Sequence, residues 1–144
     1  MLTDELQESV TSMCVKKEIF IAAPADIVFE TVLAQPPFAD HNLSLKIEPW
    51  VGGRWFRDLG NNTGHLWGHV QVIKPPKILE MSGPLMMSYP AISHVQYKLT
   101  EGSGGTKLEL THQAMGLIKQ DHRDGVSKGW TMMLDVIKDV AEKK

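Results

Sequence analysis

The chain has 144 residues, of which 42% are apolar, and its 15 basic and 17 acidic side chains give a net charge of −2. This length and composition predict one soluble globular domain whose core needs no disulfide or structural metal. The basic residues are scattered along the chain, which argues against nucleic-acid binding. No apolar stretch is long enough to predict a membrane span. The single cysteine, Cys14, excludes an intrachain disulfide.

The first predicted elements are a strand and a helix that follow a short lead-in. Residues 1–13 carry apolar residues at helical spacing, but the segment is too short to form a stable helix alone. They also lack the pattern of a secretory signal, so we expect a reducing, cytoplasmic location. Residues 14–22 are rich in strand formers. Pro24 and Asp26 then mark the start of a helix, which ends before Pro36.

Six more strands are predicted between this helix and the C-terminal segment. Alternating apolar residues, β-branched runs and bounding turn residues mark each of them. The glycine-rich stretch 101–105 is typical of a hairpin loop between the last two. The predicted strands cover 43–48, 54–60, 65–74, 78–82, 93–100 and 106–115.

The C-terminal segment predicts a long amphipathic helix. Its apolar residues fall at i, i+4, i+7, i+8, i+11, i+14 and i+15, which is one face of about five helical turns. These residues are Val126, Trp130, Met133, Leu134, Ile137, Val140 and Ala141. A single antiparallel sheet cannot bury its apolar face alone, so this helix is its natural cover. We therefore expect an α+β fold in which a curved antiparallel sheet wraps around the helix, with residues 14–144 as one domain.

Five stretches in this order resemble a known family. They are IAAPADIVFETV, VGGRW, GHVQVIKPPKILEMSG, LTEGSGGTKLELTHQAMG and GWTMMLDVIKDV. Together they resemble the START-like, or birch-pollen-allergen-like (SRPBCC), superfamily, and within it the family named for the activator of heat-shock protein 90 ATPase. The resemblance implies a helix-grip fold with a cavity between the sheet and the C-terminal helix. Members of the family range from co-chaperone domains to small-molecule binders, with cyclase-type enzymes among more distant relatives, so the fold alone does not decide the function.

The stretch GHLWGHV raises the question of a metal site, because two histidines lie four residues apart. On a strand, however, His65 and His69 would lie about 13 Å apart, too far to share one ion. Their side chains would point the same way as Trp67, while Val70 and its alternating neighbours would face the helix. We therefore expect His65, Trp67 and His69 on the outer face, either solvated or as an interaction surface. A one-residue shift in register would reverse this assignment.

The candidate ligand-binding residues follow from the expected cavity. The helix would supply its floor and the sheet its wall, with Trp55 near one end. The floor residues are Trp130, Met133 and Ile137, and the wall residues are Val70, Met81, Tyr97, Leu110 and His112. Ordinary core packing is the alternative for each of them, and for His112 a hydrogen bond to a neighbour competes with a ligand contact. Met86 and Met87 lie in a predicted loop that could form the lip of the pocket.

We expect the protein to bind a hydrophobic or amphipathic small molecule, without a cofactor or a metal ion. A co-chaperone-like interaction module is the first alternative, with a homodimer or a chaperone as partner. An enzyme of the cyclase or hydratase type, with His112 as acid or base, is the second. The sequence offers no motif for a catalytic nucleophile or for phosphate binding, and no catalytic residue is assigned.

Overall fold

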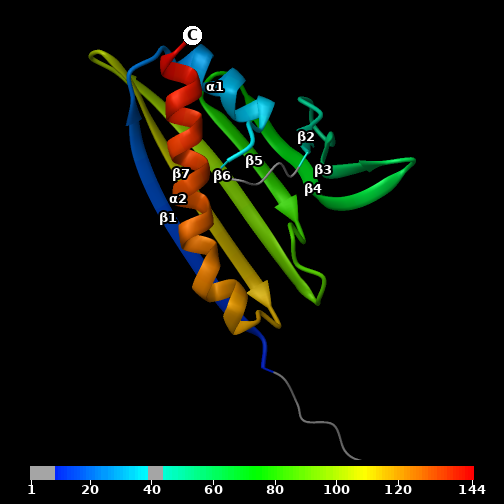
Figure 1. The fold of residues 1–144 in the computed structure, drawn as a ribbon. Coiled ribbons are helices and arrows are strands. Elements are labelled where there is room, and N and C mark those ends of the chain that lie inside the picture. The colour runs from blue at the N-terminus through cyan, green and yellow to red at the C-terminus, as the bar shows by residue number, and fades with distance from the viewer. Residues whose placement is uncertain (1–8, 39–43) are drawn as a thin grey trace, which may run out of the picture.

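The fold is seen in a computed structural model that describes residues 9–38 and 44–144. Its strands form one antiparallel sheet in the order β1-β7-β6-β5-β4-β3-β2, and α2 lies lengthwise along one face (Figure 1). The elements are β1 (Thr11–Ile21), α1 (Ala25–Ala34), β2 (Leu45–Ile47), β3 (Arg54–Gly60), β4 (Thr63–Lys74), β5 (Ile78–Gly83), β6 (Ala91–Gly102), β7 (Gly105–Gly116) and α2 (Gln120–Glu142).

The core lies between the sheet and α2, as the amphipathic pattern of the helix predicts. The residues of the helical stripe that are fully or nearly fully buried include Trp130, Leu134 and Ile137, and they join one cluster with the inward side chains of the strands. α1 packs beside the C-terminal end of α2 on the same face (Figure 1). The predicted fold class is therefore confirmed.

Several boundaries differ from the prediction, and two of them lie in polar segments where no hydrophobic period marks the start of an element. β1 begins at Thr11 rather than residue 14, and residues 11–13 pair with the end of β7. Residues 1–8 of the predicted lead-in lie outside the described residues. α2 begins at Gln120, six residues before the first apolar position of its stripe. Arg123 holds this first part of the helix against β1, because its guanidinium donates to the carbonyl of Ser12 at 3.1 Å and to the hydroxyl of Thr11.

β4 contains a bulge that reverses the orientation expected for two of its side chains. Trp55 of β3 pairs with Gly68 and Phe56 pairs with Leu66, so Trp67 has no partner in β3. Trp67 therefore turns to the inner face and is only 5% exposed, while Leu66 points outward. The outer-face prediction is wrong for Trp67, and the inner-face prediction is wrong for Leu66. Val70 is buried as expected.

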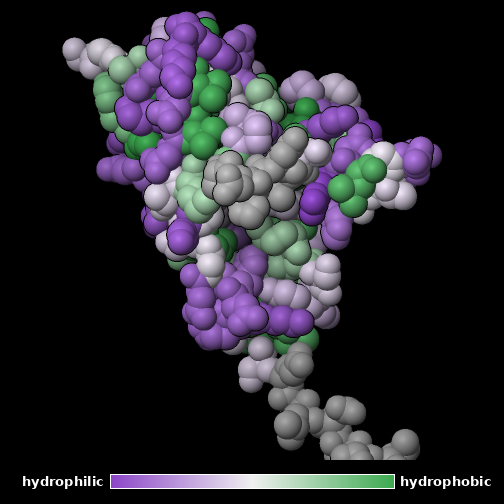
Figure 2. Space-filling view, viewed as in Figure 1, coloured by the Kyte–Doolittle hydropathy of each residue, from purple (hydrophilic) through white to green (hydrophobic). Residues whose placement is uncertain are grey.

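The surface of the face that carries α2 is polar at both ends of the helix. Figure 2 shows hydrophilic side chains gathered over the start and the end of α2. In the part of the chain that the structure describes, no helix is both long enough and apolar enough to span a membrane.

Candidate functional site

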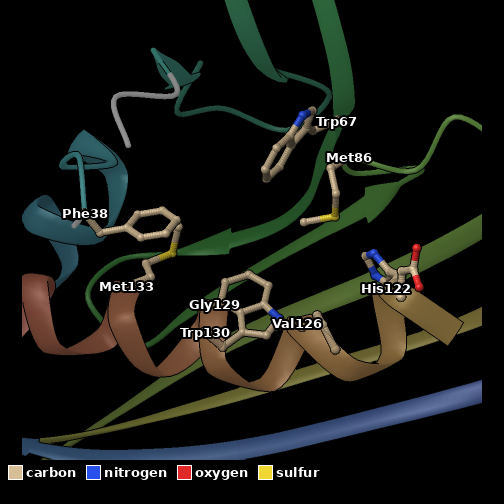
Figure 3. Close-up of a pocket in the computed structure, with 10 residues that line it drawn as sticks. Phe38, Trp67, Met86, His122, Val126, Gly129, Trp130 and Met133 are labelled. Atoms are coloured by element: carbon tan, nitrogen blue, oxygen red, sulfur yellow. The ribbon is translucent and has the colours of Figure 1, made fainter. Parts of the chain in front are cut away.

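A cavity of about 260 Å³ lies beside the N-terminal half of α2. Figure 3 shows the helix along one side of it, with Trp67 of β4 and Met86 of the β5–β6 loop on the opposite side. Its lining residues are Phe38, Trp67, Met86, Asp121, His122, Gly125, Val126, Gly129, Trp130 and Met133. Aromatic and other apolar side chains predominate, which is typical of small-molecule sites.

The helical side of the cavity includes two glycines, Gly125 and Gly129, one turn apart. A Cβ added at either position would meet no atom within 4 Å. Glycine in a helix interior costs about 0.5–1 kcal/mol relative to alanine, so neither packing nor helix propensity accounts for these two residues. Their effect is to leave open space against the backbone of α2, between His122 and Met133.

The opposite side of the cavity is built by an aromatic pair. The rings of Trp55 and Trp67 meet edge to face with their centroids 5.3 Å apart. The indole N–H of Trp55 donates to the side-chain oxygen of Gln35 at 3.1 Å, which fixes Trp55 at the end of α1. Trp55 in turn supports Trp67, so the wall of the cavity is anchored in the core.

The bulge that aims Trp67 at the cavity depends on close contact between β4 and β5. A Cβ on Gly68 would lie 2.4 Å from the carbonyl oxygen of Ser82, and one on Gly83 would lie 2.3 Å from that of Trp67. No larger residue fits at either position without a backbone shift. The carbonyl of Trp67 also accepts a hydrogen bond from the backbone N–H of Leu85 at 2.8 Å. The loop that carries Met86 is thereby tied to the bulge.

Among the described lining residues, His122 is the one with a buried, unpaired polar atom. Its Nε2 has essentially no solvent access and no hydrogen-bond partner among the described residues. Burial, with a further contribution from the charge of Arg123, lowers the pKa of His122. The imidazole is therefore neutral at pH 7, and its Nε2 can donate or accept one hydrogen bond depending on the tautomer.

The structure brings only part of the predicted ligand-binding set to the cavity. Trp130 and Met133 line it, and Met86 of the predicted lip does so with 41% of its surface exposed, whereas Met87 is buried. The other predicted residues are buried in the core and do not line this cavity. They are Trp55, Val70, Met81, Tyr97, Leu110, His112 and Ile137.

His112 is satisfied by its neighbours. The indole N–H of Trp130 donates to its Nδ1 at 2.9 Å, so Nε2 carries the proton and donates to the hydroxyl of Ser93 at 2.8 Å. Burial, followed by the charge of His122, lowers the pKa of His112 to about 4. Both ring nitrogens are engaged and the side chain has no solvent access, so His112 fixes Trp130 rather than facing the cavity.

The expected interaction surface is not formed as one patch. His65 and His69 are exposed, as predicted, but Trp67 lies on the other side of the sheet. Within the described residues, no group of His, Cys, Asp and Glu side chains is placed to hold a metal ion.

Several lining residues were not predicted from the sequence. Phe38, Asp121 and His122 lie outside the expected strands and the expected helical stripe. The usable signal was the pair Gly125 and Gly129, because glycines four residues apart within a helix share one face.

Comparison with known proteins identifies the family. The family model described as Activator of Hsp90 ATPase homolog 1-like protein matches residues 22–142. No curated protein matches the sequence. Among solved structures, a putative uncharacterized protein from Rhizobium leguminosarum is 20% identical, with 96% of this chain and 100% of that chain covered and a TM-score of 0.75.

Two further solved structures share the fold. A protein of unknown function from Staphylococcus aureus is 15% identical, with 93% and 96% of the two chains covered and a TM-score of 0.67. The Aha1 dimer from Colwellia psychrerythraea, solved in solution, is 16% identical, with 90% and 96% covered and a TM-score of 0.64. At these identities the likeness concerns the fold, while the family model covers most of the sequence: the chain belongs to the family of Activator of Hsp90 ATPase homolog 1-like proteins.

Proposed function

We propose that this protein binds a hydrophobic or amphipathic small molecule in the cavity between α2 and the sheet. The observation that carries the proposal is a cavity of about 260 Å³ with a largely apolar lining, beside two helical glycines that leave room for an occupant. Aromatic walls on two sides offer flat contact surfaces, and Met86 and Met133 can adjust to the shape of the ligand.

The volume limits the size of the ligand. A dry apolar cavity of about 150 Å³ holds one benzene molecule. A cavity of about 260 Å³ therefore suits one ring with a few substituents, or a short acyl chain. A larger ligand would need Met86 and its loop to move, and that residue is the most exposed part of the apolar wall.

Native mass spectrometry tests this function, with a matched pair of variants. In Gly129→Leu the new side chain would grow into open space and fill the cavity, whereas Lys128→Leu places the same side chain on an exposed position outside the lining. We expect the wild type and Lys128→Leu to carry a bound mass that denaturation releases, and Gly129→Leu to lack it. A wild type that carries no bound mass, and takes up none of a set of ring-sized apolar compounds, contradicts the proposal.

Self-association is a second candidate function, with homodimer formation as its simplest case. Ile92 of β6 and Met115 of β7 are cross-strand neighbours and are 55% and 58% exposed. They lie beside a surface hollow of about 480 Å³ that reaches β1. Adjacent exposed apolar side chains favour an interface, and the Aha1 relative from Colwellia psychrerythraea is described as a dimer. Light scattering of the wild type and of Met115→Lys would test it, because a dimer through this face should dissociate in the variant.

A further inference from the structure

We propose that His112 is a positioning residue for ligand binding: it holds the indole of Trp130 in the wall of the cavity and so raises the affinity for a ligand that it does not touch. Ser93 acts one step further away, by fixing the tautomer of His112. This inference rests on the proposed ligand-binding function and names residues outside the cavity on which that function depends.

Two hydrogen bonds in series run from the sheet to the cavity. Nε2 of His112 on β7 donates to the hydroxyl of Ser93 on β6 at 2.8 Å, and Nδ1 accepts from the indole N–H of Trp130 on α2 at 2.9 Å. All three residues are buried, and of the three only Trp130 belongs to the cavity lining. The hydrogen-bonded path from the sheet to the cavity therefore ends at Trp130.

The tautomer of His112 is fixed from both ends of this path. The indole of Trp130 can only donate, so Nδ1 must be the unprotonated nitrogen and the proton of the neutral ring lies on Nε2. In the other tautomer two N–H groups would face each other. The oxygen of Ser93 accepts the proton on Nε2 and so favours the required tautomer. Loss of that hydroxyl should therefore weaken the hold on Trp130.

Packing alone does not hold the indole of Trp130, because the ring borders the cavity. The rings of His112 and Tyr97 meet it edge to face, with centroids 5.6 and 6.4 Å away. The neighbouring Gly129 leaves open space in the lining. Without an acceptor at His112 the buried indole N–H would have no partner, and the ring could pair it with water by turning into this space. A turned indole would occupy volume that the ligand needs.

Ligand affinity then depends on the fraction of molecules in which the indole has its native orientation. The apparent Kd equals the intrinsic Kd divided by the fraction of binding-competent molecules. The bond between Trp130 and His112 keeps this fraction near one. The loss of one hydrogen bond to a buried donor corresponds to a factor of about ten, so it should raise the apparent Kd about tenfold.

The test uses p-xylene, a single ring with two methyl groups, as the probe. Binding is followed by NMR of protein labelled at its methionine methyl groups. Met86 and Met133 line the cavity and report binding there, while the exposed Met115 lies outside the lining and serves as an internal control. The indole N–H resonance of Trp130, assigned by its loss in Trp130→Phe, reports whether the bond to His112 is present.

Four variants separate positioning from general damage to the core. His112→Leu removes the acceptor, and His112→Asn keeps one, because the side-chain oxygen of asparagine is bonded to Cγ as Nδ1 is in histidine. Ser93→Ala removes only the far end of the path. Thr106→Val is the matched control, because it removes another buried hydroxyl, which donates to the carbonyl of Ala23 at 2.8 Å outside the cavity lining.

We expect the Kd of p-xylene to rise about tenfold in His112→Leu and about threefold in Ser93→Ala. His112→Asn and Thr106→Val should stay within about twofold of the wild type. The indole N–H resonance of Trp130 should move upfield in His112→Leu, as a lost hydrogen bond requires, and keep its position in Thr106→Val.

A double-mutant cycle decides whether His112 acts through Trp130. In Trp130→Phe there is no indole N–H to hold, so adding His112→Leu should leave the Kd within about twofold of that of Trp130→Phe alone. General damage to the core would instead raise the Kd by the same factor in both backgrounds.

The possible outcomes separate this inference from the proposed function. If p-xylene shifts Met86 and Met133 but His112→Leu binds it as the wild type does, or loses the same factor in the Trp130→Phe background, the positioning role is refuted and ligand binding stands. If His112→Leu does not fold, Ser93→Ala decides: a Kd equal to that of Thr106→Val refutes the role, and a higher one supports it. If p-xylene shifts neither methionine in the wild type, the inference fails together with the proposed function.

Discussion

The buried His112 should make the fold less stable as the pH falls from 6.5 toward 4. Its pKa falls from 6.5 in the unfolded chain to about 4 in the folded protein, because burial disfavours the charged ring and the charge of His122 adds to this. Between these two values the unfolded chain binds more protons than the folded protein. Stability from His112 is therefore fully present above pH 6.5 and is lost as the pH falls toward 4.

The size of the effect follows from these two pKa values. One pKa unit corresponds to about 1.4 kcal/mol, so protonation of His112 costs about 3 kcal/mol once the pH is below both values. Between pH 7 and pH 5 the expected loss is about 2 kcal/mol. For a urea slope of about 2 kcal/mol per molar, the midpoint of unfolding should fall by about 1 M.

Urea unfolding of wild type and His112→Gln at pH 7 and pH 5 isolates this contribution. The variant is expected to be less stable at pH 7, because a buried hydrogen-bonded side chain is replaced. The comparison that matters is the loss between the two pH values, since titrating groups that do not interact with His112 contribute equally to both proteins. We expect the wild type to lose about 2 kcal/mol more than the variant. Equal losses would show that His112 is not held neutral by the fold, and the reasoning would be wrong.

Three other variants test the architecture of the cavity. Gly125→Ala combined with Gly129→Ala should raise the free energy of unfolding by about 1–2 kcal/mol and the Tm by several degrees, because both positions are helical and open, while ligand binding in the native mass spectrum weakens. Gly68→Ala should destabilise by about 1–3 kcal/mol in urea unfolding, because its Cβ would overlap the backbone of β5. Trp55→Phe should cost about 1–3 kcal/mol in the same assay, because Gln35 loses its indole donor in the core.

The fold could be predicted because its main determinants are periodic. The stripe that contains Trp130 and Ile137 identifies the long helix, and the alternation in residues 93–100 and 106–115 identifies the strands β6 and β7. The hairpin loop between them was also predicted, and the structure has a turn there with Gly104 at φ +82°. The spacing of apolar residues in the sequence reflects which side chains face the core. In the structure, the buried residues of the long helix and of these two strands recur at that same spacing.

The cavity was harder to predict because it forms where periodicity fails. Trp67 reaches it through a bulge, and a one-residue bulge reverses the faces that simple alternation assigns. His122 precedes the apolar stripe of α2, so no pattern marked its face. The predicted residues Met81, Leu110 and Ile137 belong to the buried core cluster and do not line the cavity. Whether a core residue borders a cavity depends on packing details that the pattern of apolar residues does not contain.

His112 and His122 differ in how the fold pairs their ring nitrogens. Burial lowers the pKa of both, and both are neutral at pH 7. At His112 the fold supplies a donor from Trp130 and an acceptor from Ser93, so it can pair a buried imidazole completely. Those bonds also fix Trp130, which holds one wall of the cavity in place before any ligand enters. At His122 of α2, no described residue pairs with Nε2, and this atom has essentially no access to solvent or to the cavity. Because Trp130 is held in this way, that wall of the cavity is preorganised, and a preorganised site loses little conformational entropy on binding.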